Sequence, residues 1–281
     1  MNVPAAVLAV VLAEAAVGGL AVLWVAPTWR AVRHGYEILL GSTLALMALG
    51  AWASLRAPLD SVIESATTDG IVQAATWTGR GLAAVALLGG LSAVLLLARQ
   101  ATAGRVVGIA SALAGVATLV PLAMLRTATG SPGGFPQGLV ELVLGAFFLG
   151  AVWDGLILGH WYLVERRLSN RYMEWMARVN VAAVVSGFLA VLLSARNPVP
   201  CAGLVGRDLE LCALTFSPLL SIGSTTLLLG FGVVALVAII AGFNYKLAQE
   251  GGRSIQAATG MFYLAVILAP AAEFAAKVRF F

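Results

Sequence analysis

Long apolar segments follow one another along the whole chain and restrict its fold more than any other feature. Hydrophobic residues make up 60% of the sequence and charged residues 11%, whereas a soluble domain carries about 25% charged residues. A transmembrane helix needs roughly 20 mainly apolar residues, and eight segments reach that length. We predict spans at residues 4–25, 35–55, 71–98, 105–125, 138–163, 177–195, 218–247 and 256–276.

The predicted fold is an all-α, polytopic integral membrane bundle that forms a single transmembrane domain over residues 1–281. Each span is expected to be helical, because a segment in lipid must satisfy its own backbone groups. The first span has no basic n-region and contains Glu14, so we expect it to remain in the mature protein. The sequence has no zinc-type cysteine cluster, P-loop or dinucleotide fingerprint, and its net charge of +4 requires no nucleic-acid partner.

Basic residues gather in alternate loops, which predicts the orientation of the spans. The loops after the first, third, fifth and seventh spans hold Arg30, Arg33, Arg99, Arg105, Arg166, Arg167, Arg171, Lys246 and Arg253. Cytoplasmic loops are the richer in arginine and lysine, so we place both termini on the extracytoplasmic side. Arg126 stands alone in an outer loop, and the C-terminal tail with Lys277 and Arg279 is a mild exception to the rule. The bias towards Ala, Gly, Val, Leu and Arg favours a bacterial cytoplasmic membrane.

The cysteines give an independent indication of the outer side. Cys201 and Cys212 are the only two in the chain, and both lie in the predicted outer loop 196–217. Disulfides persist in oxidising compartments outside the cytoplasm. We therefore predict a Cys201–Cys212 disulfide, with two free thiols as the alternative.

The chain has two histidines, and both fall at predicted cytoplasmic ends of spans. His34 begins the second span in the string RHGYE, and His160 closes the fifth span in the string GHWYLV. Imidazole is a common axial ligand of haem iron. The pair predicts a b-type haem between His34 and His160, which requires both rings to reach one depth on facing helices. The alternatives are ordinary interface histidines, or one histidine acting alone as a proton donor or quinone contact.

Further residues would complete such a haem site. Gly155 and Gly159 form a small-xxx-small pair, which lets another backbone or a flat ligand approach. Trp153 lies seven residues before His160 and therefore shares its helix face. Three arginines at the same predicted interface are candidates for pairing with haem propionates: Arg33, Arg166 and Arg167.

Several carboxylates fall inside the predicted spans. Glu14 lies near the middle of the first span, Glu37 near the start of the second, Asp154 within the fifth and Glu141 near its outer start. Acids in such places are costly and usually face the protein interior. No base is expected at mid-depth beside Glu14, which predicts a protonated or hydrogen-bonded carboxyl. We interpret Glu14, Glu37 and Asp154 as proton-path groups or quinone contacts, with neutral helix-packing carboxyls as the alternative.

These features predict an integral membrane subunit of a bacterial electron-transfer complex that holds haem b, contacts quinone, or does both. The expected partners are the bilayer and other membrane or peripheral subunits. The alternatives are a scaffold subunit without a cofactor and a transporter for a small solute or protons. A stand-alone enzyme is not expected, because the sequence offers no nucleophile–base pair; any activity would be that of an oxidoreductase complex.

Overall fold

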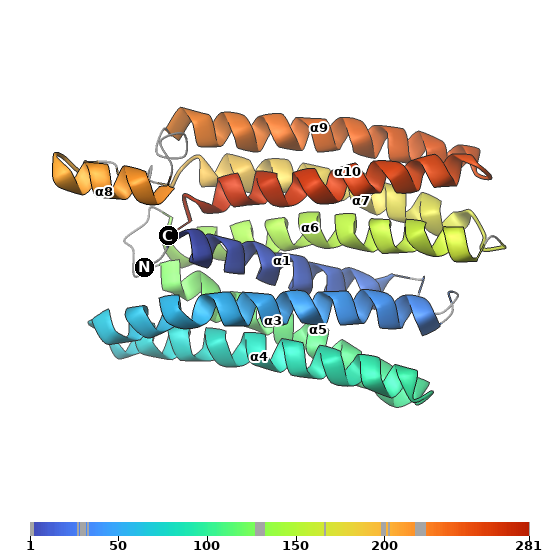
Figure 1. Cartoon of the computed structure of the whole chain (residues 1–281), viewed down its shortest axis with the longest axis horizontal. Coiled ribbons are helices and arrows are strands. Elements are labelled where there is room, and N and C mark those ends of the chain that lie inside the picture. Colours follow the sequence, from blue (N-terminus) through green and yellow to red (C-terminus); the bar gives the residue numbers. More distant parts are fainter. Residues whose placement is uncertain are drawn as a thin grey trace.

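The computed structural model describes residues 3–26, 28, 32, 34–126, 133–165, 167–197, 201, 203–216 and 223–280. These residues form nine helices and no strand (Figure 1). The helices are α1 (Val3–Val25), α3 (His34–Ser65), α4 (Asp69–Leu97), α5 (Ala101–Leu125), α6 (Gly134–Val164), α7 (Arg171–Ser194), α8 (Arg207–Phe216), α9 (Gly223–Glu250) and α10 (Ser254–Lys277).

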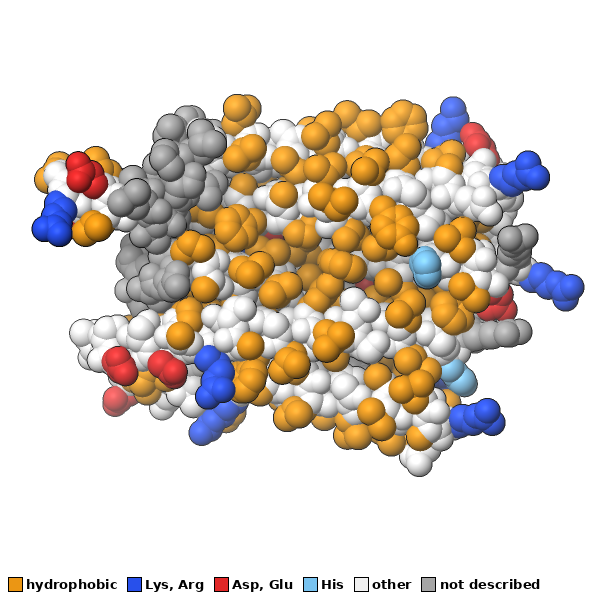
Figure 2. All heavy atoms as spheres, in the orientation of Figure 1, with side chains coloured by type: hydrophobic (Ala, Val, Ile, Leu, Met, Phe, Trp, Pro, Cys, Tyr) orange, Lys and Arg blue, Asp and Glu red, His pale blue; other side chains and the backbone are white. Residues whose placement is uncertain are grey.

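Eight of these helices, all except α8, are long and apolar enough to cross a membrane. Large hydrophobic side chains are exposed along their flanks, among them Leu46, Leu87 and Ile267, each at least two-thirds exposed. Figure 2 shows hydrophobic side chains over the middle of the visible face and charged side chains towards its two ends. Such a surface suits lipid better than water, and eight apolar helices of this length indicate a multi-pass membrane protein, in line with the sequence.

The long helices pack in two groups, with α1 and α6 at the junction between them (Figure 1). The first group contains α1, α3, α4 and α5, and the second contains α6, α7, α9 and α10. Most of α1 is enclosed by other helices, and it is the most deeply buried of the eight spans. The interior of the protein therefore centres on α1 and α6.

Several helices extend beyond the predicted spans. The second predicted span ended at residue 55, before Arg56, but α3 continues to Ser65 and contains Pro58. The predicted spans leave residues 164–176 as a basic loop, but residues from Arg171 onward form the first turns of α7. Charged residues end a span at the edge of the lipid, but they do not end the helix, because its backbone bonds continue equally well in water.

The termini and the cysteine-containing segment lie at one end of the bundle (Figure 1). Cys201 and Cys212 form a disulfide, with their Cα atoms 5.8 Å apart, so the predicted pairing is confirmed. Both cysteines pack against a small cluster formed by Val7 and Val278. The disulfide therefore supports the end of the bundle where α1 begins and α10 ends.

Candidate functional site

Three charged side chains meet in the protein interior between α1 and α10. The Nζ atom of Lys277 lies 3.0 Å from Oε1 of Glu14 and 3.3 Å from Oε2 of Glu273. None of the three residues is more than 1% exposed. We call Glu14, Glu273 and Lys277 the acid–lysine triad.

The triad lies deep in the bundle because of where Glu14 stands. Glu14 is eleven residues from either end of α1, which places its Cα about 16 Å from each end at 1.5 Å per residue. The expectation that no base would reach Glu14 is wrong, and so is the placement of Lys277 in an exposed tail. Side chains on a helix tilt towards its N-terminus, so Lys277 at the C-terminal end of α10 points back into the bundle.

A glycine on α6 makes room for the two carboxylates. A Cβ atom on Gly145 would lie 2.6 Å from Oε1 of Glu14 and 2.9 Å from Oε2 of Glu273. Both distances are too short for any side chain larger than hydrogen. Gly145 therefore lets acids from α1 and α10 converge at one point against the backbone of α6.

A second set of buried polar groups continues from the triad towards the end of the bundle with the termini. The Nζ atom of Lys277 donates to the backbone oxygen of Glu141 at 3.3 Å. The Glu141 carboxylate pairs with Nη1 of Arg126 at 3.1 Å and accepts a hydrogen bond from Nδ2 of Asn197 at 3.1 Å. Arg279 donates to the backbone oxygen of Asn197 at 2.6 Å. The network thus joins α1, α6 and α10 to residues that follow α5 and α7.

Arg126 and Arg279 were expected in aqueous segments, but both are buried. Burial lowers the pKa of the Arg126 guanidinium from its ordinary value, and the nearby Glu141 carboxylate opposes that shift. Burial lowers the pKa of Arg279 as well, again against Glu141. Arginine starts so far above neutral pH that both groups keep their charge. The apparent exceptions to the loop-charge rule at this end are therefore internal charges.

The other predicted acids have different surroundings. Glu37 is fully buried and forms two hydrogen bonds to Arg105 of α5, at 2.8 Å from Nη2 and 3.2 Å from Nε. This pair joins the first turns of α3 and α5. Asp154 is also fully buried on α6, but neither of its carboxylate oxygens has a hydrogen-bond partner among the residues that the structure describes.

The two histidines lie at the surface and contact different helices. The His34 side chain is 51% exposed, and its Nδ1 lies 3.4 Å from Nη2 of Arg105 on α5. His160 is exposed, and its Nδ1 lies 3.3 Å from the hydroxyl of Tyr263 on α10. Each imidazole therefore already has a protein contact, on α5 for one and on α10 for the other.

Three other residues of the predicted haem site, Gly155, Gly159 and Trp153, take part in helix packing. The ring of Phe262 fills the space beside Gly155, and Thr259 fills the space beside Gly159, so α10 occupies this face of α6. Trp153 is partly buried and packs against the apolar core. Arg167 is exposed. The remaining two candidates, Arg33 and Arg166, lie outside the described residues.

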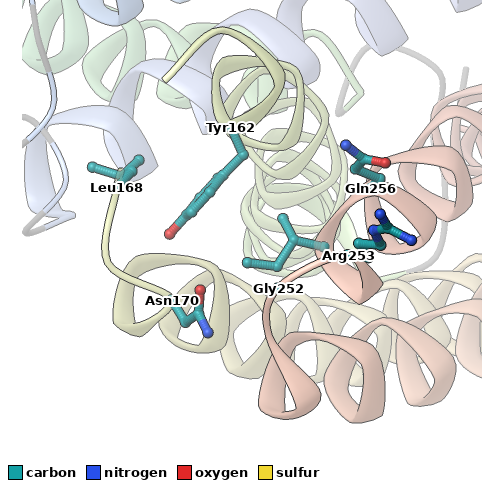
Figure 3. A pocket seen from close by; sticks show the side chains of 7 residues that line it. Tyr162, Leu168, Asn170, Gly252, Arg253 and Gln256 are labelled. Atoms are coloured by element: carbon teal, nitrogen blue, oxygen red, sulfur yellow. The ribbon is translucent and has the colours of Figure 1, made fainter. Parts of the chain in front are cut away.

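A pocket of about 320 Å³ opens at the end of the bundle opposite the termini (Figure 3). Tyr162, Leu168 and Asn170 line one side, and the turn between α9 and α10 with Gly252, Arg253, Ile255 and Gln256 lines the other. The Tyr162 hydroxyl accepts a hydrogen bond from the backbone nitrogen of Met173 at 3.2 Å and donates to Ser169. Its bonding is complete, so Tyr162 holds the α6–α7 connection in place.

Sequence reasoning missed Glu273, Lys277 and Gly145. One signal was available, because Glu273 and Lys277 stand one helical turn apart at the end of an apolar span. Their meeting with Glu14 depends on the packing of α1 against α10, which no local pattern encodes. The chain matches no protein-family model, no curated protein and no solved structure.

Proposed function

We propose that this chain is a multi-pass protein of the bacterial cytoplasmic membrane that translocates protons, with the acid–lysine triad as the proton-binding site. The observation that carries the proposal is the pairing of two buried carboxylates, Glu14 and Glu273, with the single ammonium of Lys277. Ionisable groups at this depth are costly and are typical of ion and proton pathways.

The charge balance of the triad favours a bound proton. With both carboxylates ionised and Lys277 charged, the triad has one net negative charge in a medium of low dielectric constant. The charges of Arg126 and Arg279 act on Glu141, which neutralises them in part. Two carboxylates that share one cation disfavour each other's ionisation, so one of them keeps a proton. That proton is the one exchanged during transport.

The proposal includes an orientation. The basic loops after α1, α4, α6 and α9 would face the cytoplasm, and the termini with the disulfide would face the oxidising side. The triad would then receive or release its proton on the extracytoplasmic side, from which the network of Glu141, Arg126 and Asn197 extends inward. Partner subunits in the membrane are compatible with this arrangement.

An electron-transfer subunit that holds haem b or contacts quinone is the second candidate. Its support is a contact between α3 and α6: the ring of Trp161 packs directly over Gly35. These residues adjoin His160 and His34, so the two histidine-bearing helix ends meet. The exposure of both imidazoles and their separate contacts with Arg105 and Tyr263 favour this candidate less than the triad favours proton transport.

Proton flux in proteoliposomes tests the proposal. The purified full-length chain is reconstituted with a pH-sensitive dye inside the vesicles, and a pH step is applied outside. We expect the wild type to accelerate equilibration, and Glu14→Gln and Glu273→Gln to return it to the rate of protein-free vesicles. Glu64→Gln, at an exposed carboxylate near the end of α3, is the matched control and should behave as the wild type.

An absorbance spectrum of the same sample separates the alternatives. A Soret band that disappears in His160→Ala would support the haem candidate. Wild-type flux equal to that of empty vesicles, in a sample without such a band, would reject both proposals. A scaffold subunit without a cofactor would then be the remaining hypothesis.

A further inference from the structure

Asp154 is a buried carboxyl that the triad does not use. It stands ten residues before the end of α6 and is 0% exposed. Neither oxygen has a hydrogen-bond partner, and Asp154 forms no ion pair within the described part of the chain. An ionised carboxylate in apolar surroundings without a partner is prohibitively costly, so the group holds a proton instead.

The position of Asp154 is related to that of Glu14 by the crossing of α1 and α6. These helices approach so closely that Gly18 packs against the backbone of Ala146, and Gly150 against the backbone of Gly18. On α1, Glu14 comes one turn before Gly18. On α6, Asp154 comes one turn after Gly150. The two acids therefore lie on opposite sides of one tight crossing, one on each helix.

The distance between the two acids follows from the helix rise. Glu14 lies beside Gly145, and Asp154 is nine residues farther along α6, which corresponds to about 13 Å. Backbone against backbone leaves no space for a side chain at the crossing. The α1–α6 crossing thus separates the two acids, and a proton can pass between them only when the helices move apart or water enters.

Tyr36 lies near the end of the bundle opposite the termini. Tyr36 is fully buried near the start of α3, with its hydroxyl beside the side chain of Thr28. Its helix packs against the helix that carries Asp154, since the Trp161 ring of α6 lies over Gly35. The Asp154 and Glu37 carboxyls both act electrostatically on the phenol, and Arg105 binds Glu37. The half-exposed His34 begins the same helical turn, so solvent is near.

We propose that Asp154 is a second proton-binding group, placed across the α1–α6 crossing from the acid–lysine triad and in exchange with solvent through Tyr36. When water enters between the two groups, the Asp154 carboxyl gives its proton to that water, the water passes a proton to the phenol oxygen, and the phenol releases its own proton outward; Tyr36 stays neutral and Asp154 is a carboxylate until it is reloaded. The reverse steps reload Asp154. This inference rests on the proposed function and adds a second proton-binding group to the same pathway, on the other side of the α1–α6 crossing.

Variants in the flux assay, combined with infrared spectroscopy, test the assignment. We expect Asp154→Asn to return flux to the rate of protein-free vesicles and to remove one carbonyl-stretch band of a protonated carboxylic acid. Tyr36→Phe should slow flux and keep that band, because the carboxyl stays protonated. Asn244→Leu is the matched control, and it should conduct as the wild type. It removes a buried side chain of α9, away from the crossing, that has no hydrogen-bond partner in the described segments.

The possible outcomes separate this inference from the proposed function. Wild-type flux in Asp154→Asn, together with lost flux in Glu14→Gln, would overturn the second group and leave the triad standing. An infrared spectrum that is unchanged by Asp154→Asn would overturn it as well, because Asp154 would then carry no proton. A wild type without flux would overturn both.

Discussion

The two ends of the bundle contain the same types of charged residue but use them differently. At the end with the termini, Arg126, Lys277 and Arg279 are buried and bonded to acids or backbone oxygens. At the opposite end, most of the basic residues that the structure describes are exposed, among them Arg99, Arg167, Arg171, Lys246 and Arg253, whereas Arg105 is partly buried and bonded to Glu37. Exposed charges can be solvated by water, whereas buried charges need internal partners and so build a site. The predictions below use this contrast, beginning with the largest effect.

Removal of the ammonium group of Lys277 from the acid–lysine triad should have the largest effect on stability. Lys277→Met leaves Glu14 and Glu273 buried without a counter-charge, and breaking a buried pair in this way costs about 3–5 kcal/mol. Thermal unfolding in detergent measures the loss, and Lys246→Met at the exposed end should change stability by no more than about 0.5 kcal/mol. Equal stability of the two variants would contradict the contrast between the ends. Adding Glu14→Gln to Lys277→Met should recover part of the loss.

Opening the disulfide should have the next largest effect, and only at the end with the termini. The Cys201–Cys212 bond closes a loop with a sequence separation of 11 residues, and such a bond contributes about 2–4 kcal/mol. A reductant should lower the unfolding temperature of the wild type. The double variant Cys201→Ser with Cys212→Ser should already unfold at the lower temperature and should not respond to the reductant. An identical response of both proteins would show that the bond does not support this end.

A single methyl group beside the triad should have a moderate effect. In Gly145→Ala, the new Cβ would overlap both carboxylates, and overpacking of this kind costs about 1–3 kcal/mol. Flux should fall along with stability, since Glu14 and Glu273 are displaced together. Gly90→Ala on α4 is the control, because its Cβ would meet no atom within 4 Å. Similar behaviour of the two variants would argue against a tightly packed triad.

The smallest effect on stability and flux is expected at the end of the bundle opposite the termini. His34→Ala and His160→Ala remove surface side chains, and each should change stability by no more than about 0.5 kcal/mol. Neither should stop proton flux, because both imidazoles lie outside the path from Asp154 through Tyr36. Loss of flux or of a haem band in either variant would shift the account towards electron transfer.

The sequence predicted the helices well and the site only in part. The length of the apolar segments alone identified eight spans, because each segment in lipid must satisfy its own backbone hydrogen bonds. It also identified Glu14 and Asp154 as buried acids, and the disulfide from two cysteines in one loop. It misplaced Lys277, since a lysine directly after the predicted end of the last span is typical of a water-facing anchor. Only the packing of α10 against α1 shows that its side chain turns inward.

The sequence also does not show which group occupies the space beside each glycine, because the neighbouring helix decides it. Gly155 and Gly159 formed a recognisable spacing and suggested room for a flat ligand, yet Phe262 and Thr259 fill that space. Gly145 is not part of such a spacing, yet it makes room for the triad. A glycine removes a side chain, and what enters the space is decided by the neighbouring helix and not by the spacing along the chain.

Proton movement driven by a membrane potential tests the central claim most directly. Vesicles that contain the wild type and a potassium gradient, with valinomycin added, develop an inside-negative potential that draws protons inward. The account predicts rapid internal acidification with the wild type and a rate equal to that of the bare lipid with Glu14→Gln. Acidification at one and the same rate in wild-type, Glu14→Gln and protein-free vesicles would contradict it.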